Sequence, residues 1–145
     1  MKTFNYIQSA FALIIILLLS TAAKLGKDNC DRVIKYHVSK VAAAGQPEVE
    51  LKMEVIVDPK NNNITIEFGQ DRKKVTEIEV QECNLNKDLT AGFGLYKGLK
   101  KDGNGKATTI KIEAKDGKIR IYNPSPETDN DKIEMTVDKW ELVKN

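Results

Sequence analysis

The chain has 145 residues, of which 41% are hydrophobic and 30% charged, and its formal net charge at pH 7 is +2. This length and composition fit one domain with one hydrophobic core. A charge this close to zero excludes the strongly basic surface of a nucleic-acid-binding protein and the composition of an acidic tail, so no nucleic-acid partner is expected.

The first 23 residues predict a secretory signal peptide. Lys2 supplies a positive charge, an unbroken apolar run extends from Ala10 to Leu19, and small residues follow up to Ala23. Such a run fits the core of a signal peptide and is shorter than the roughly 20 residues that span a membrane. An uncleaved N-terminal anchor is the alternative. Cleavage after Ala23 would leave residues 24–145 as one secreted or periplasmic domain, which touches the membrane only through the signal peptide before cleavage.

Both cysteines, Cys30 and Cys83, lie in the part of the chain expected to be exported. An even number of cysteines in an exported chain favours a disulfide. A bond between them would close a loop of about 50 residues and contribute roughly 3–5 kcal/mol to stability. Two free, buried thiols are the alternative.

The first exported segment, residues 31–44, fits two structures. As a strand it places Ile34, Tyr36 and Val38 on one face, whereas as a helix it groups Val38 and Val41 on an apolar stripe. Its β-branched and aromatic residues favour the strand, and its alanines favour a short N-terminal helix.

From residue 48 onward, alternating apolar and polar residues predict strand after strand. Two breaks in this alternation predict irregularities: a bulge or a late strand start near Thr76, because Val75 is out of phase, and a bulge or bend near Asp138. Asp116-Gly117 predicts a two-residue hairpin turn. The expected strands cover these ranges: 49–57, 64–68, 75–82, 89–99, 107–114, 119–122 and 132–143.

Seven or eight short antiparallel strands predict an all-β meander. We expect a small barrel in preference to a two-layer β-sandwich, because a closed meander leaves no exposed strand edge. The pattern resembles that of lipocalin-like small barrels. The Gly-x-Trp signature near the first strand of lipocalins is absent, so no family is assigned.

The stretch from Thr90 to Lys101 contains three glycines followed by lysines, as a phosphate-binding loop would. Its spacing fits neither a dinucleotide fingerprint nor a P-loop, and a hairpin and strand follow where a helix would be needed. We therefore expect no nucleotide cofactor. As a strand, this stretch places Gly92 and Gly94 on one face, which is typical of a bend, a close side-chain neighbour or a ligand contact.

No set of residues is arranged for catalysis. A nucleophilic site would need the only histidine, His37, which faces outward if its segment is a strand. The alternating acids Glu127, Asp129 and Asp131 are more typical of a solvated loop than of a calcium site. We expect neither an enzyme, nor a metal site, nor any cofactor.

The sequence favours a small exported, non-catalytic β-domain that binds a small hydrophobic ligand in a barrel interior. The expected ligand-binding residues are Met53, Phe68, Phe93, Trp140, Gly92 and Gly94. The alternative is a surface-interaction module that contacts an extracellular or periplasmic protein or a glycan through Lys/Glu strand faces and a basic hairpin. The expected residues of that hairpin are Lys97, Lys100, Lys101 and Lys106.

Overall fold

The computed structural model describes residues 29–69, 72–101, 107–123 and 133–144. The predicted signal peptide, the acidic loop and Lys106 lie outside these ranges. The described residues form eight strands and no helix: β1 Ile34–Ala43, β2 Val49–Asp58, β3 Asn63–Phe68, β4 Arg72–Cys83, β5 Ala91–Lys101, β6 Ala107–Lys115, β7 Lys118–Tyr122 and β8 Ile133–Leu142.

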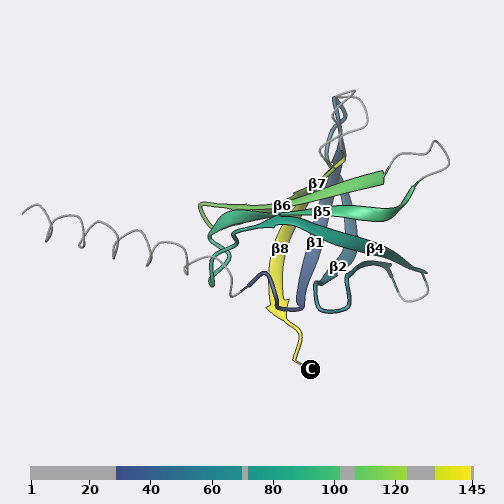
Figure 1. The fold of residues 1–145 in the computed structure, drawn as a ribbon. Coiled ribbons are helices and arrows are strands. Elements are labelled where there is room, and N and C mark those ends of the chain that lie inside the picture. The colour runs from purple at the N-terminus through teal and green to yellow at the C-terminus, as the bar shows by residue number, and fades with distance from the viewer. Residues whose placement is uncertain (1–28, 70–71, 102–106, 124–132, 145) are drawn as a thin grey trace, which may run out of the picture.

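The strands form a closed barrel in which each strand pairs with the next along the chain and β1 pairs with β8. Figure 1 shows β1, β2 and β8 running across the direction of β4, β5 and β6. The all-β prediction is confirmed, and the barrel is confirmed over the sandwich. The ambiguous first segment is strand β1, which has hydrogen-bonded partners on both sides.

The predicted irregularity at Asp138 is confirmed. The pairs His37↔Lys139 and Val38↔Val137 leave Asp138 as an extra residue on β8, and the next register shift leaves Ser39 as an extra residue on β1. Ser39 Oγ donates a hydrogen bond to Asp138 Oδ1 at 2.7 Å. The two bulged residues are therefore hydrogen-bonded to each other across the β1–β8 pairing that closes the barrel.

The prediction for β4 is wrong. β4 pairs with β3 without interruption from Phe68↔Arg72 to Asn63↔Glu77, so there is neither a bulge at Thr76 nor a late start. Val75 simply faces outward and is 56% exposed. The irregularity in β4 lies further along, between the pairs that Val80 and Glu82 make with β5.

Apolar side chains on alternate strand positions fill the barrel. Alternation predicts that Ile112 and Ala114 of β6 and Ile119 and Ile121 of β7 face inward, and all four are buried. Asp116 and Gly117 both have positive φ, as the tight β6–β7 turn requires. The largest fully buried side chains are Tyr36, Ile64, Ile78, Leu85, Leu89, Ile112, Ile121, Val55 and Val57.

One end of the barrel is closed by the β4–β5 loop and the N-terminal segment. Cys30 and Cys83 form a disulfide that joins them. Asn86 shapes the loop, because its Oδ1 accepts hydrogen bonds from the backbone N–H groups of Thr90 and Ala91 at 2.9 and 3.1 Å. Leu89 was expected in a strand but lies in this loop, with φ of 50° and a fully buried side chain, so β5 begins at Ala91.

Removal of the disulfide should destabilise the fold strongly. The two cysteines are 53 residues apart, and in the chain-entropy model a loop of that size contributes about 4 kcal/mol. Chemical denaturation should therefore show a free energy of unfolding lower by about 4 kcal/mol in the double variant Cys30→Ser/Cys83→Ser than in the oxidised protein. The reduced wild type is the control and should match the variant. An unchanged midpoint would contradict this role.

Candidate functional site

The end of the barrel opposite the disulfide leaves apolar side chains exposed. β1 and β2 form a hairpin whose tip projects beyond the crossing strands in Figure 1. On its inner face, Val49 is 62% exposed and Leu51 is 42% exposed. Ile133 on β8, which pairs with Ala43, is 44% exposed. Val49, Leu51 and Ile133 are therefore exposed at this end, while Leu142 and Val143 are exposed at the other end and Val75 and Leu99 elsewhere.

The inner face of the β1–β2 hairpin, called the hairpin wall below, lines an open hollow of about 420 Å³. Its lining residues are Val41, Ala43, Gln46, Pro47, Val49 and Leu51. Gln46 is the one polar residue among them, and none is charged. The volume lies within the range of small-molecule sites, about 300–1,000 Å³. A wall of this composition can bind hydrocarbon and offers nothing to hold an ion.

The hollow could have been anticipated from strand lengths. The alternation of residues 49–57 places Val49 and Leu51 on the same face as Met53, and the sequence predicted a ligand in the barrel interior and not on this hairpin. β1 and β2 have 10 residues each, whereas β3 has 6 and β7 has 5. Since β3 is the partner of β2 and is shorter, β2 must extend beyond it.

The expected ligand-binding residues do not form one group. Met53 is buried at the base of the hairpin, and Phe68 and Trp140 are half-buried against the core. Phe93 was expected in the interior, and this placement is corrected. The neighbouring pair Gly94↔Ile112 faces inward, so Phe93 faces outward with Glu113.

Neighbouring groups account for Gly92 and Gly94 of β5. A Cβ placed on Gly94 would lie 2.5 Å from Tyr96 Oη, because the ring of Tyr96 lies over Gly94 inside the barrel. A Cβ on Gly92 would collide with the backbone carbonyl of Asn84, and Gly92 has φ of 106°. The glycines make room for a tyrosine ring and a loop carbonyl.

Phe93 belongs to a small cluster on the outer surface. The ammonium of Lys111 lies 5.1 Å from the centre of the Phe93 ring and 5.4 Å from that of Tyr122, at distances typical of cation–π contacts. Lys111 also forms an ion pair with Glu113 at 3.2 Å. A hydrogen bond with Tyr122, and then the one with Glu113, raise the pKa of Lys111.

The predicted basic hairpin is described only in part. Lys97 is exposed on β5 and pairs across the sheet with Glu79. The side chains of Lys100 and Lys101 lie outside the described set, as does Lys106. A joint role for the four lysines stays a prediction.

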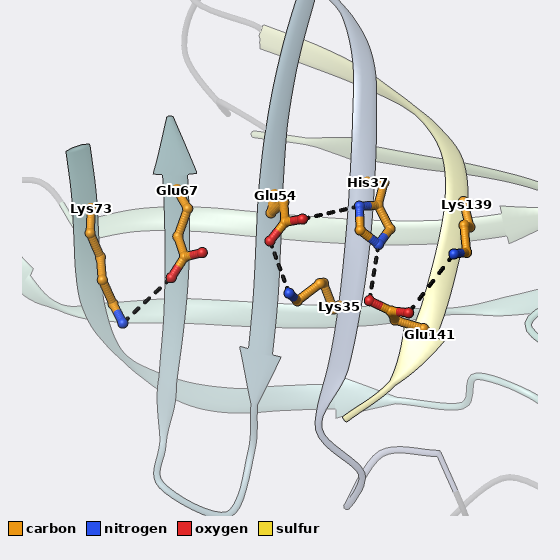
Figure 2. A network of polar contacts seen from close by, with 7 residues as sticks. All are labelled: Lys35, His37, Glu54, Glu67, Lys73, Lys139 and Glu141. Carbon is orange, nitrogen blue, oxygen red and sulfur yellow. Dashed lines mark hydrogen bonds and ion pairs between the residues drawn. The ribbon is translucent and has the colours of Figure 1, made fainter. Parts of the chain in front are cut away.

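A row of charged side chains crosses the outer surface from β4 to β8 (Figure 2). Within it, Lys35 Nζ lies 2.9 Å from Glu54 Oε2, and this hydrogen bond is the main cause that raises the pKa of Lys35. A hollow of about 410 Å³ lies beside the row. The row consists of Lys73, Glu67, Glu54, Lys35, His37, Glu141 and Lys139.

His37 faces outward, as predicted, and both of its ring nitrogens meet carboxylates. Nδ1 lies 3.3 Å from Glu54 Oε1, and Nε2 lies 3.2 Å from Glu141 Oε1. A neutral imidazole has one N–H, so both contacts are hydrogen bonds only in the imidazolium form. Within the described ranges, no group of three or more His, Cys, Asp or Glu residues could hold a metal ion.

Two buried tyrosines are the main polar groups of the interior. Tyr36 Oη is fully buried and has no hydrogen-bond partner in the described part of the chain. Burial raises the pKa of Tyr96 to about 12. Burial, assisted by the neighbouring Tyr96, raises the pKa of Tyr36 far above its ordinary value.

The chain matches no protein-family model, no curated protein and no solved structure. In the described ranges, no helix has the length and apolar composition needed to cross a membrane. The disulfide is compatible with an oxidising compartment.

Substitution of Gly94 should test the packing of the Tyr96 ring. The added methyl group of Gly94→Ala would force that ring to move, at a cost of about 1–3 kcal/mol in the free energy of unfolding. In a Tyr96→Leu background, which lacks the ring, the same substitution should cost much less, as a double-mutant cycle would show. Equal costs in both backgrounds would mean that the ring does not lie over Gly94.

The buried tyrosines should make the protein sensitive to alkali. Below pH 10 both are neutral in the folded and unfolded states, so they contribute no pH dependence. Above pH 10 the unfolded chain ionises first while the fold keeps Tyr36 and Tyr96 neutral, so the free energy of unfolding falls as pH rises. The expected slope is about 1 kcal/mol per pH unit for each tyrosine.

Urea unfolding between pH 9 and pH 12 would measure this slope. The double variant Tyr36→Phe/Tyr96→Phe should lose most of it, and because the lysines are the same in both proteins, the difference isolates the tyrosines. An equal slope in the variant would contradict the assignment.

Proposed function

We propose that the protein is a small exported, non-catalytic binding domain that takes a small hydrophobic ligand at the open end of its barrel. The observation that carries the proposal is the uncharged hollow of about 420 Å³ on the hairpin wall, with Val49 and Leu51 exposed to solvent within it. Soluble proteins that leave contiguous apolar surface in water generally use it for binding.

The interior is a poorer place for the ligand than the open end. Buried side chains fill the barrel at its centre, including the Tyr96 ring over Gly94 and the fully buried Tyr36. A ligand there would have to displace close-packed side chains, which proteins tolerate poorly. The hairpin wall needs no such rearrangement, because its side chains already face solvent.

The chemistry of the wall favours a hydrocarbon group. Each methylene that leaves water contributes about 0.8 kcal/mol, so a chain of about six methylenes contributes about 5 kcal/mol before the entropy of association is subtracted. The second hollow is less suited to this ligand, because its lining includes the charged residues Lys52, Glu54 and Glu67, which a hydrocarbon would have to desolvate.

Export is the remaining part of the proposal. The N-terminal sequence supports it, and so does the disulfide, since such bonds persist in oxidising compartments. An exported carrier of hydrophobic molecules needs no catalytic group. Such a carrier acts by removing the apolar surface of its ligand from water.

A charge placed in the hollow should abolish binding. Val49→Asp puts a carboxylate in the apolar hollow, and a ligand that binds there must remove water from this carboxylate. We therefore expect at least a tenfold loss of affinity for a neutral fluorescent hydrophobe such as N-phenylnaphthylamine. The measurement is a fluorescence titration with the purified protein, accompanied by competition with alkanols of increasing chain length.

Val75→Asp is the matched control. Val75 is also a valine on a strand, has a similar exposed fraction of 56% and does not line the hollow. This variant should bind as the wild type does. Equal affinities for all three proteins, or no binding by the wild type to any hydrophobe, would refute the proposed function.

A further inference from the structure

The hairpin leaves one strand edge of the barrel without a partner. β2 pairs with β1 from Val57 to Val49, with one register shift at which Leu51 and Lys52 together lie opposite Ser39. Its ladder with β3 extends only from Asp58↔Asn63 to Glu54↔Glu67. The segment Val49–Met53 therefore has no β3 partner among the described residues. On alternate residues, backbone N–H and C=O groups point to this free side, where another strand could bind them.

The sequence of this edge, Val-Glu-Leu-Lys-Met, is complementary to itself. When two copies are placed antiparallel with Leu51 opposite Leu51, Glu50 of each copy lies opposite Lys52 of the other. On the inner face, Val49 lies opposite Met53. Both outer-face pairs then have opposite charges and the inner-face pairs are apolar, which are the combinations that stabilise antiparallel strands.

The two charges of this edge, Glu50 and Lys52, form no ion pair with any residue that the structure describes. Neighbouring charges of the hairpin have partners: Glu54 pairs with Lys35, and Glu48 pairs with Lys40 at 3.5 Å. In the part of the chain that the structure describes, Glu50 and Lys52 are exposed and form no ion pair. They are therefore available to a second chain.

We propose that two copies of this chain associate through the edge Val49–Met53 of β2, antiparallel and related by a two-fold axis. The contact is isologous, since the same five residues serve on both sides, so it closes as a dimer and does not propagate. It joins the two β1–β2 hairpins into one continuous sheet and covers part of the exposed surface of Val49 and Leu51.

The local structure limits the pairing to this segment. At Glu54 the edge is already occupied by β3, so a second chain cannot continue along it. At the other end the strand stops at Val49, and Pro47 has no N–H to donate. Five paired residues make a small interface, so we expect a reversible dimer that forms at high protein concentration.

The dimer goes beyond the proposed function and can be tested separately from it. Glu50 and Lys52 do not line the apolar hollow. Their substitution should change self-association while leaving affinity for a hydrophobe within about twofold in the monomeric state. Loss of the dimer with intact ligand binding, or the reverse, would therefore identify which proposal fails.

Charge reversal at either position should prevent association. Glu50→Lys places two lysines opposite each other in both outer-face pairs, and Lys52→Glu places two glutamates opposite each other in both. Each single variant should weaken the dimer by about tenfold or more. The measurement is sedimentation velocity over a range of concentrations, with the naturally processed protein. Both sites are exposed, so the fold should persist, as circular dichroism would verify.

Two experiments in which dimerisation should be restored distinguish strand pairing from a general effect of charge. The double variant Glu50→Lys/Lys52→Glu reverses both partners and should dimerise as the wild type does. An equimolar mixture of the two single variants should form a heterodimer, because each lysine then faces a glutamate. A monomeric wild type at millimolar concentration, single variants that dimerise normally, or a failure of both restorations would overturn the proposal.

Discussion

The pairing of β1 with β8 is the contact on which the rest of the structure depends. It closes the sheet, so each strand must direct one face into a shared interior. The closing strands twist sharply at the bulges of Ser39 and Asp138, whose side chains bond to each other. Closure fixes which residues lie inside but does not equalise strand lengths, so β2 extends beyond its shorter partner β3.

This overhang gives the barrel two unlike ends. At one end the disulfide, the Asn86 loop and the buried side chains of Leu85 and Leu89 cover the barrel interior. At the other end, alternate residues of the β1–β2 hairpin are still apolar, although the hairpin there extends beyond the barrel interior and these side chains face solvent. The apolar wall around Val49 and the free edge of β2 therefore share one origin, and both proposed contacts use the hairpin.

Much of the fold could be predicted from alternation, because alternate positions on a strand face opposite sides. That rule gave the inward residues of β6 and β7 and the irregularity at Asp138. It failed where a residue's type did not match its side: Val75 is apolar but faces outward, and so does Phe93. The ring over Gly94 could not be predicted, since it depends on three-dimensional packing.

The central claim is that the protein binds through the apolar wall of the overhanging hairpin. A titration with a short-chain alkanol, followed by ¹H–¹⁵N NMR, tests it most directly because each backbone amide reports its own surroundings. The account predicts chemical-shift changes concentrated at the amides of Val41, Ala43, Gln46, Val49 and Leu51, with the Leu85–Phe93 region unaffected. Changes centred on that closed end or on Tyr36 and Tyr96 in the interior, or no saturable change at all, would contradict it.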